Sequence, residues 1–253
     1  MSIPRFHYAG LAGAAEKPAH GTPSSRQIEL CGAEARHALG ARRLRAGEPI
    51  VLFDGAGTEV DARIVSVGGR ERLSVELAER RLVPRPPASR LTVAVALAKG
   101  PRQVWLAEKL TELGVGAIWG VNFSRSAARA SGASVERWGR RAVEAAKQSG
   151  QAWLPQVVLR QDLSTVIEQA GGFELLLVGG PGRPLLSVLQ EAGAPRSILI
   201  LIGPEGGLTA QETAAAQAAG FQTVRVGCTT LRVETAAVAA ASVIVACADA
   251  LGA

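Results

Sequence analysis

The residues best suited to chemistry lie in one glycine-rich stretch near the end of the chain. An apolar run, Ile198 to Ile202, stops at Gly203-Pro204-Glu205-Gly206-Gly207, and a helical pattern opens at Thr209. The three glycines would let the backbone approach a ligand closely, and Glu205 is the only acidic side chain of the turn. We therefore expect a ligand here, although a tight turn stiffened by proline has the same composition.

Other common catalytic patterns are missing from the sequence. It contains no GxGxxG, GxxxxGK[ST], GxSxG or HExxH motif, which argues against a dinucleotide fingerprint, a P-loop, a serine-hydrolase elbow and a zinc protease. His7, His20 and His37 lie far in sequence from the glycine-rich stretch and are expected to be surface or packing residues. Arg232 and Glu234 follow a predicted strand, so catalysis would depend on positioning and electrostatics, with a co-substrate carrying the reactive group.

A strand, a loop and a helix must position this stretch. Thr209 followed by Glu212 predicts a capping box, in which hydroxyl and carboxylate both accept hydrogen bonds from backbone N–H groups. From Leu91 onward, apolar strands alternate with helices, which predicts a parallel sheet covered on both faces. Ligands of such sheets bind at the carboxyl ends of the strands, where segments 178–183, 203–208 and 227–232 are expected as loops. The strands are predicted at 91–98, 116–121, 156–159, 173–178, 198–202 and 223–226, and the helices at 102–113, 134–149, 162–170, 184–192, 209–219 and 233–249.

The first part of the chain has a different pattern. Short strands are predicted at 28–30, 50–53, 60–67 and 73–78, with turns at Asp54-Gly55 and Gly68-Gly69. A helix is predicted over Ala33 to Leu44. These elements suggest a small β-barrel, followed by a stiff proline linker at 84–89 that excludes helix and ladder formation.

Charge divides the chain in the same way. Residues 1–160 contain 24 Lys and Arg against 14 Asp and Glu, whereas residues 161–253 contain 4 against 8. A basic surface favours a phosphate-bearing partner, although an arginine-rich solvated surface gives the same count. The helix at 134–149 carries four basic residues, Arg137, Arg140, Arg141 and Lys147. They could form either an RNA contact or a solvent-exposed charged face.

The remaining composition points to a soluble cytoplasmic protein. Cys31, Cys228 and Cys247 are widely spaced, so neither a disulfide framework nor a metal site is expected. The N-terminus lacks the apolar core of a signal peptide, and no apolar run is long enough for a membrane span. The final helix, apolar on nearly every side, must be buried in the stack or against a second subunit.

Several motifs, in one order along nearly the whole chain, resemble the ribosomal RNA small subunit methyltransferase E family of the SPOUT class. LIGPEGGLTAQE at 201–212 and VGCTTLRVETAAVAA at 226–240 look like that family's two C-terminal motifs. Four earlier segments also match motifs of that family: PRFHY at 4–8, LRAGEPIVLFDG at 44–55, LAKGPRQVWLAEKLTELGV at 97–115 and EAAKQSG at 144–150.

The resemblance implies a fold and an activity. It implies a PUA-like, RNA-binding β-barrel over residues 1–84 and, over residues 90–253, a SPOUT methyltransferase domain with a parallel sheet and a C-terminal trefoil knot. It also implies a homodimer that methylates N3 of one uridine in the decoding region of 16S rRNA with S-adenosyl-L-methionine (AdoMet), without a metal. The alternatives are a non-enzymatic RNA-binding or ribosome-assembly protein with a vestigial methyltransferase domain, and a small-molecule enzyme that uses a nucleotide.

The resemblance also implies a site. Its AdoMet-binding residues would be Val178, Gly179, Ile202, Gly203, Pro204, Glu205, Gly206, Gly207, Val226, Gly227, Leu231 and Ala236. Arg232 would orient the uracil or stabilise its N3 anion, unless it pairs with Glu234 or contacts a second subunit. Arg42, Arg43, Arg45 and Arg125 would contact RNA.

The chain departs from the family pattern at three positions. Ser124 stands where an acidic residue is frequent, Gln151 where an arginine is frequent, and Val233 where a threonine is common. These departures are expected to affect RNA or dimer contacts more than AdoMet binding.

Overall fold

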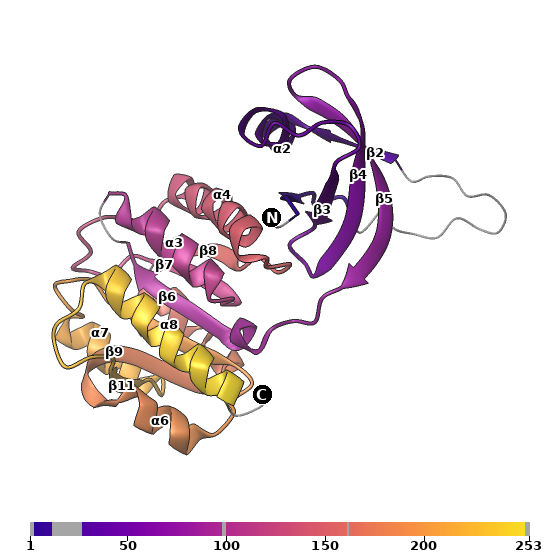
Figure 1. Cartoon of the computed structure of the whole chain (residues 1–253). Helices are drawn as coiled ribbons and strands as arrows, with labels where there is room; N and C mark the ends of the chain where they lie inside the picture. The colour runs from indigo at the N-terminus through magenta and orange to yellow at the C-terminus, as the bar shows by residue number, and fades with distance from the viewer. Residues whose placement is uncertain (1–2, 12–26, 98–99, 161, 251–253) are drawn as a thin grey trace. The chain divides into compact units, whose positions relative to one another are not determined.

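The computed structural model describes residues 3–11, 27–97, 100–160 and 162–250 of the 253-residue chain. His20 and the beginning of the 97–115 motif lie outside the described residues. The chain separates into two compact units (Figure 1). The first comprises Met1–Arg85 with Ala146–Leu154, and the second comprises Pro86–Ala145 with Pro155–Ala253.

The first unit is built on a five-stranded sheet in the order β1-β3-β4-β5-β2. β1 pairs with β3 in parallel, and the other pairs are antiparallel. Among the described residues, β1 and β2 are the two ends of this sheet, which is consistent with the small β-barrel expected from the sequence. Its elements are β1 (Arg5–His7), β2 (Gln27–Cys31), α2 (Gly32–Arg36), the π-helical turn η1 (His37–Ala41), β3 (Pro49–Phe53), β4 (Thr58–Val67) and β5 (Arg72–Leu82).

Both predicted hairpin turns are present in this sheet. Oδ1 of Asp54 accepts hydrogen bonds from the backbone N–H groups of Ala56 (2.7 Å) and Thr58 (2.9 Å), which closes the β3–β4 turn. Gly69, with φ of +78°, occupies the β4–β5 turn in the left-handed region that favours glycine. The predicted helix 33–44 is wrong at its end, because the chain leaves it after Ala41 and Arg43 adopts φ of +54°.

The second unit contains a six-stranded sheet in the order β11-β9-β10-β6-β7-β8, in which every pair is parallel. This confirms the sheet predicted from the alternating pattern. Its elements are η2 (Pro87–Arg90), β6 (Leu91–Ala96), α3 (Arg102–Glu112), β7 (Ala117–Val121), α4 (Gly132–Ser149, whose last residues belong to the first unit), β8 (Gln156–Arg160), α5 (Leu163–Ile167), η3 (Ala170–Gly172), β9 (Leu175–Pro184), α6 (Leu185–Ala192), β10 (Ile198–Ile202), α7 (Ala210–Ala218), β11 (Gln222–Arg225) and α8 (Val233–Ala250).

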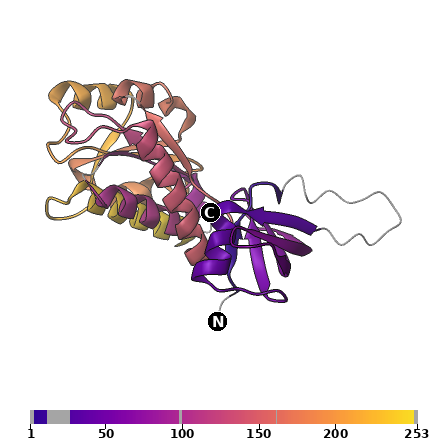
Figure 2. The same cartoon turned by 90° about the horizontal axis from the view of Figure 1, so that it is seen from above.

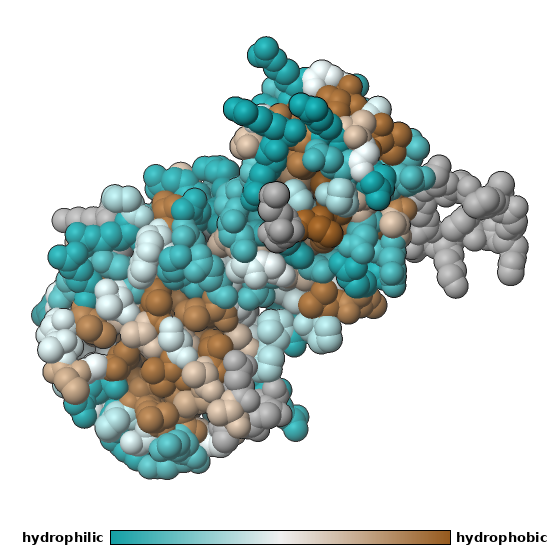
Figure 3. Space-filling model, in the orientation of Figure 1, coloured by the Kyte–Doolittle hydropathy of each residue, from teal (hydrophilic) through white to brown (hydrophobic). Residues whose placement is uncertain are grey.

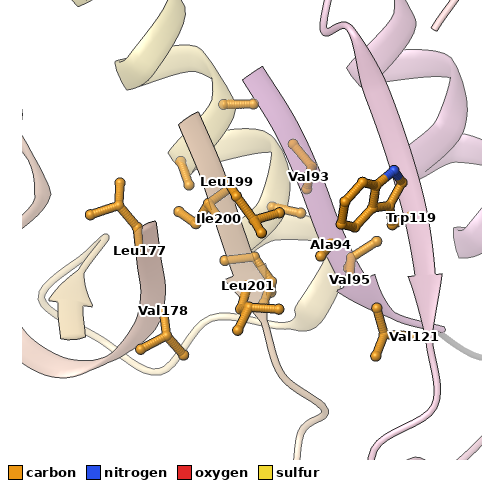
Figure 4. Close-up of a cluster of buried hydrophobic side chains, with 14 of the residues drawn as sticks. Val93, Ala94, Val95, Trp119, Val121, Leu177, Val178, Leu199, Ile200 and Leu201 are labelled. Atoms are coloured by element: carbon orange, nitrogen blue, oxygen red, sulfur yellow. The ribbon is translucent and has the colours of Figure 1, made fainter. Parts of the chain in front are cut away.

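Helices cover both faces of the sheet. α3 and α6 pack against α8, which lies on β6, whereas α5 packs against α7. Figure 2 shows α8 and α7 on opposite sides of the strands. Every residue of β10 is buried, and its side chains lie between those of β9 and β6 (Figure 4). Burial on both faces explains why β10 is an uninterrupted apolar run.

Two expectations for this unit are corrected. The proline linker does form one helical turn, η2, because proline is tolerated in the first turn, where its missing N–H would have no partner. The segment expected as a loop at 178–183 belongs instead to β9, which continues to Pro184.

Candidate functional site: a glycine-lined cavity at the strand ends

A cavity of about 660 Å³ lies at the carboxyl ends of β9, β10 and β11. These strands are neighbours in the order β11-β9-β10, so their ends meet at one edge of the sheet. The cavity is lined by three segments, 178–181, 202–205 with 207–208, and 225–231, together with Thr213, Thr223, Val233 and Ala236. Segments far apart in the sequence therefore form one concave surface because the strands that precede them are parallel.

An interruption of β9 shapes one wall. Thr223 pairs with Val178, but the next residue of β11, Val224, pairs with Arg183, so Gly179–Gly182 bulge out of the ladder. A Cβ atom on Gly182 would lie 2.0 Å from the carbonyl oxygen of Thr223, which excludes any side chain there. This close approach requires glycine and explains the composition GGPG.

The loop after β10 forms the second wall and is held by hydrogen bonds at its end. The capping box is confirmed: Oγ1 of Thr209 accepts from the Glu212 N–H (3.1 Å), and Oε2 of Glu212 accepts from the Thr209 N–H (2.8 Å). Oε1 of Glu212 also accepts from the N–H of Ser124 (2.8 Å), in the segment after β7. Nη1 of the adjacent Arg125 donates to the carbonyl oxygen of Gly206 (3.0 Å).

Glu212 therefore joins two segments through one carboxylate. Burial alone raises the pKa of Glu212, but hydrogen bonds from the backbone and side chains of Ser124 and Thr209 outweigh it and hold the pKa below its ordinary value. The ionised form is the one that the folded chain stabilises.

The structure brings most of the expected AdoMet-binding residues together. Val178, Gly179, Ile202, Gly203, Pro204, Glu205, Gly207, Val226, Gly227, Leu231 and Ala236 all line the cavity. Two expected site residues lie outside this lining. A Cβ atom on Gly206 would face Arg125 at 3.3 Å, so a larger side chain there would press on Arg125 rather than fill the cavity.

Arg232 is the second residue outside the lining. Its side chain is exposed, while its sequence neighbours Leu231 and Val233 both line the cavity. The alternative ion pair with Glu234 is not formed among the described residues; Oε1 of Glu234 instead lies 3.6 Å from Nε of Arg102. The carbonyl oxygen of Arg232 accepts from the N–H of Ala236 (2.8 Å) in the first turn of α8.

Several lining residues were not predicted from the sequence. Thr213, Thr223 and Arg225 reach the cavity from α7 and β11, and only the strand order shows that they do. The structure also shows the surroundings of the three residues that depart from the family pattern. Ser124 holds Glu212, Val233 lines the cavity, and the carbonyl oxygen of Gln151 accepts from Arg5 (3.1 Å) in the first unit. Of the three, only Val233 lines the cavity.

The histidines with described positions lie in the first unit. Nε2 of His7 is 3.2 Å from the carbonyl oxygen of Asp54, and His37 packs edge-on against Phe6. Within residues 3–11, 27–97, 100–160 and 162–250, no three His, Cys, Asp or Glu side chains gather as a metal site. No helix in those ranges is long and apolar enough to cross a membrane.

The four expected RNA-contact arginines are all exposed, and three of them differ from other arginines of the first unit in having no carboxylate partner in the described part of the chain. Arg42, Arg43 and Arg45 follow η1, and the structure gives their guanidinium groups no carboxylate partner among the described residues. In contrast, Arg36 pairs with Glu71 (2.9 Å) and Arg72 with Glu29 (3.4 Å) in the same unit.

On the helix α4, three of the four basic residues have carboxylate partners inside their own unit. Arg140 lies 3.9 Å from Glu136 in an exposed pair on the same helix. Arg141 pairs with Glu108 of α3 in the second unit. Nζ of Lys147, whose side chain is 2% exposed, contacts Glu34 (2.9 Å) in the first unit. This helix therefore offers a smaller basic face than its sequence suggests.

Substituting Glu212 tests the hydrogen bonds that hold the loop. Glu212→Gln is expected to lower the free energy of unfolding by about 1 kcal/mol at pH 7, as loss of a helix cap does. Because the folded pKa of Glu212 is depressed, its contribution is complete above the ordinary carboxyl pKa and is lost as pH falls through the folded value. Urea unfolding at pH 7 and at a pH below the ordinary carboxyl pKa should therefore show the variant and the parent converging at the lower pH.

Glu168→Gln is the matched control, since it removes an exposed carboxylate beyond the end of α5. It should leave the free energy of unfolding at pH 7 unchanged. A Glu212→Gln variant as stable as the parent at pH 7 would show that this carboxylate does not hold the loop.

Comparison with known proteins identifies the family. Residues 85–245 match the RNA methyltransferase domain, and residues 30–78 match the RNA methyltransferase PUA domain. The chain is 36% identical over 222 residues to the ribosomal RNA small subunit methyltransferase E of Mycobacterium bovis, covering 83% of this chain and 82% of that protein.

Two solved structures share the fold. A methyltransferase of Legionella pneumophila, solved with bound SAM, superposes with a TM-score of 0.83 at 25% identity, covering 97% of this chain and 98% of that one. The ribosomal RNA small subunit methyltransferase E of Neisseria gonorrhoeae, bound to S-adenosyl methionine, superposes with a TM-score of 0.75 at 29% identity, covering 95% and 96%. The SPOUT-type parallel sheet preceded by a PUA-like domain is thus confirmed, and the chain belongs to the ribosomal RNA small subunit methyltransferase E family.

Proposed function

We propose that this protein methylates N3 of one uridine in the decoding region of 16S rRNA, with AdoMet as the methyl donor. The observation that carries the proposal is one cavity at the ends of β9, β10 and β11, lined by segments that include the family motifs. Relatives of this chain bind S-adenosyl methionine and are named for the small ribosomal subunit. An rRNA substrate implies that the protein acts in the cytoplasm.

The cavity suits AdoMet. Glycine-bearing segments at 179–180 and 203–207 leave backbone N–H and C=O groups accessible to an adenine and a ribose. The apolar side chains of Ile202, Leu231 and Ala236 offer a surface for the adenine ring. Glu205 is the acidic group of the lining and is suited to a ribose hydroxyl or to the positively charged part of the donor.

AdoMet supplies an electrophilic methyl group on a sulfonium. In this reaction uridine N3 would lose its proton to solvent, the new N–CH3 bond would form as the S–CH3 bond breaks, and S-adenosylhomocysteine would leave. An exposed arginine beside the cavity, Arg232, can stabilise the negative charge that the uracil oxygens acquire. The family's trefoil knot, formed where the chain passes from β11 into α8, is part of the same proposal.

Methylation of isolated RNA tests the activity. With labelled AdoMet and 16S rRNA from a strain that lacks its own enzyme, we expect one uridine to acquire an N3-methyl group, mapped by mass spectrometry. Arg232→Ala is expected to reduce the rate by about 100-fold or more while AdoMet still binds, as loss of a charge-stabilising donor does. Unmethylated rRNA with intact AdoMet binding would refute the substrate, and absence of AdoMet binding would favour the non-enzymatic RNA-binding alternative.

The first unit is proposed to bind the RNA through Arg42, Arg43 and Arg45. These exposed guanidinium groups are free for phosphates, and Arg43 adopts a left-handed backbone conformation between them. Arg125 is proposed as a further RNA contact from the second unit, although one of its N–H groups is already donated to Gly206.

The double variant Arg42→Ala, Arg43→Ala tests this surface. It should weaken RNA binding and make the slope of log K against log salt shallower by about two, roughly one per lost phosphate contact. AdoMet affinity, measured by calorimetry, should not change. The control Arg36→Ala, Arg72→Ala removes two arginines of the same unit that already pair with carboxylates and should change the slope less; an equal change would contradict the assignment.

We also propose that the protein forms a homodimer. Apolar side chains gather where α8 lies in the second unit (Figure 3). Trp105 of α3 is 42% exposed, and Val238 and Val243 of α8 are only partly buried. A helix that stays apolar on its outer side favours cover by a second subunit.

Sedimentation of the purified protein tests the dimer. The parent should sediment as a dimer, and Val243→Lys should raise the dissociation constant more than tenfold, because it places a charge in an apolar contact. Gln217→Lys adds the same charge to an exposed position on α7, on the other side of the sheet, and should leave the dimer intact. A monomeric parent at tens of micromolar would contradict the proposal.

A further inference from the structure

Two side chains of opposite charge line the cavity, Glu205 and Arg225. Glu205 follows β10, and Arg225 is the last residue of β11. These strands flank β9, so the two residues reach the cavity from opposite sides of that strand. Every other lining residue is apolar, glycine, proline, threonine or cysteine. The cavity is therefore polarised, with one cationic wall and one acidic wall.

The charge of Arg225 is not neutralised by the protein. Its Nη1 lies 4.0 Å from Sγ of Cys228, and a thiol is only a weak hydrogen-bond acceptor. Within the described part of the chain, Arg225 forms no ion pair with a carboxylate. Other arginines of this unit do, since Arg183 pairs with Glu191 and Arg102 with Glu234. An unpaired guanidinium at the edge of a ligand cavity is suited to an anionic group of the ligand.

We propose that Arg225 binds the carboxylate of the methionine part of AdoMet and so selects ligands that carry a free amino-acid end. This inference rests on the proposed AdoMet site. At neutral pH that end carries one carboxylate and one ammonium group, and Glu205 on the opposite wall provides the acidic partner for the positive charge. The planar guanidinium can donate two parallel hydrogen bonds to a carboxylate, which a lysine cannot do.

Ligands with and without the amino-acid end test the assignment. S-adenosylhomocysteine has this end, whereas 5′-methylthioadenosine has the same adenine, ribose and thioether sulfur but lacks it. Arg225→Ala is expected to weaken binding of AdoMet and S-adenosylhomocysteine about tenfold, as loss of one exposed charged hydrogen-bonding partner does, and to change 5′-methylthioadenosine binding less than twofold. Arg225→Lys should restore part of the loss, because it keeps the charge without the planar fork.

The control is Arg196→Ala, which removes an exposed arginine just before β10, at the opposite edge of the sheet from the cavity. It should leave the affinities of all three ligands unchanged. Salt gives an independent readout: the parent's affinity for S-adenosylhomocysteine should fall with ionic strength more than its affinity for 5′-methylthioadenosine, and Arg225→Ala should abolish that difference.

The outcomes separate this inference from the proposed function. If the parent binds all three ligands and Arg225→Ala weakens all of them equally, or none, the carboxylate assignment is wrong while the AdoMet site stands. If Arg225→Ala leaves ligand binding intact but weakens RNA binding and reduces its salt slope, the arginine contacts a phosphate instead. If the parent binds none of the three ligands, the proposed function itself fails.

Discussion

The candidate site depends on one interruption of backbone pairing, between β9 and β11. Regular parallel pairing would have continued past Val178, but the ladder resumes only at Arg183, and Gly179–Gly182 are displaced from it. The displaced residues stay close to β11, because Gly182 packs directly on the carbonyl oxygen of Thr223. A local loss of regular hydrogen bonding thus opens a concave surface at the sheet edge, while buried β10 beside it keeps that edge rigid.

The loop after β10 is held from outside the cavity. Glu212 accepts hydrogen bonds from Thr209 and Ser124, and Arg125 donates to Gly206; none of these residues lines the cavity. The backbone groups that face the cavity are left accessible to a ligand. The segment after β7 thereby positions the loop after β10, although Arg125 and Gly206 are 81 positions apart in the chain.

Charge is used differently in the two units. Several basic residues neutralise carboxylates of their own unit, as Arg36, Arg141 and Lys147 do, and add little to an RNA-binding surface. The exposed arginines at 42, 43 and 45 and the cavity residue Arg225 have no such carboxylate in the described structure. A count of charges along the chain therefore overstates the basic face of α4 and does not distinguish the arginines available to a phosphate or a carboxylate from those engaged inside the fold.

The sequence by itself determined the elements whose pattern is local. It determined the six strands of the parallel sheet, with β10 at Ile198–Ile202, the capping box of α7 and the hairpin turns of the first unit, because burial on two faces and backbone capping depend on neighbouring residues. It did not reveal β1, which has only three residues and is defined by pairing with β3, nor the extension of β9 beyond Val178.

Only the tertiary structure decided that Arg225 lines the cavity, that Gly206 and Arg232 do not, and that Ser124 supports the loop. These facts depend on strand order and on contacts between segments far apart in the chain, which no periodicity in the sequence records.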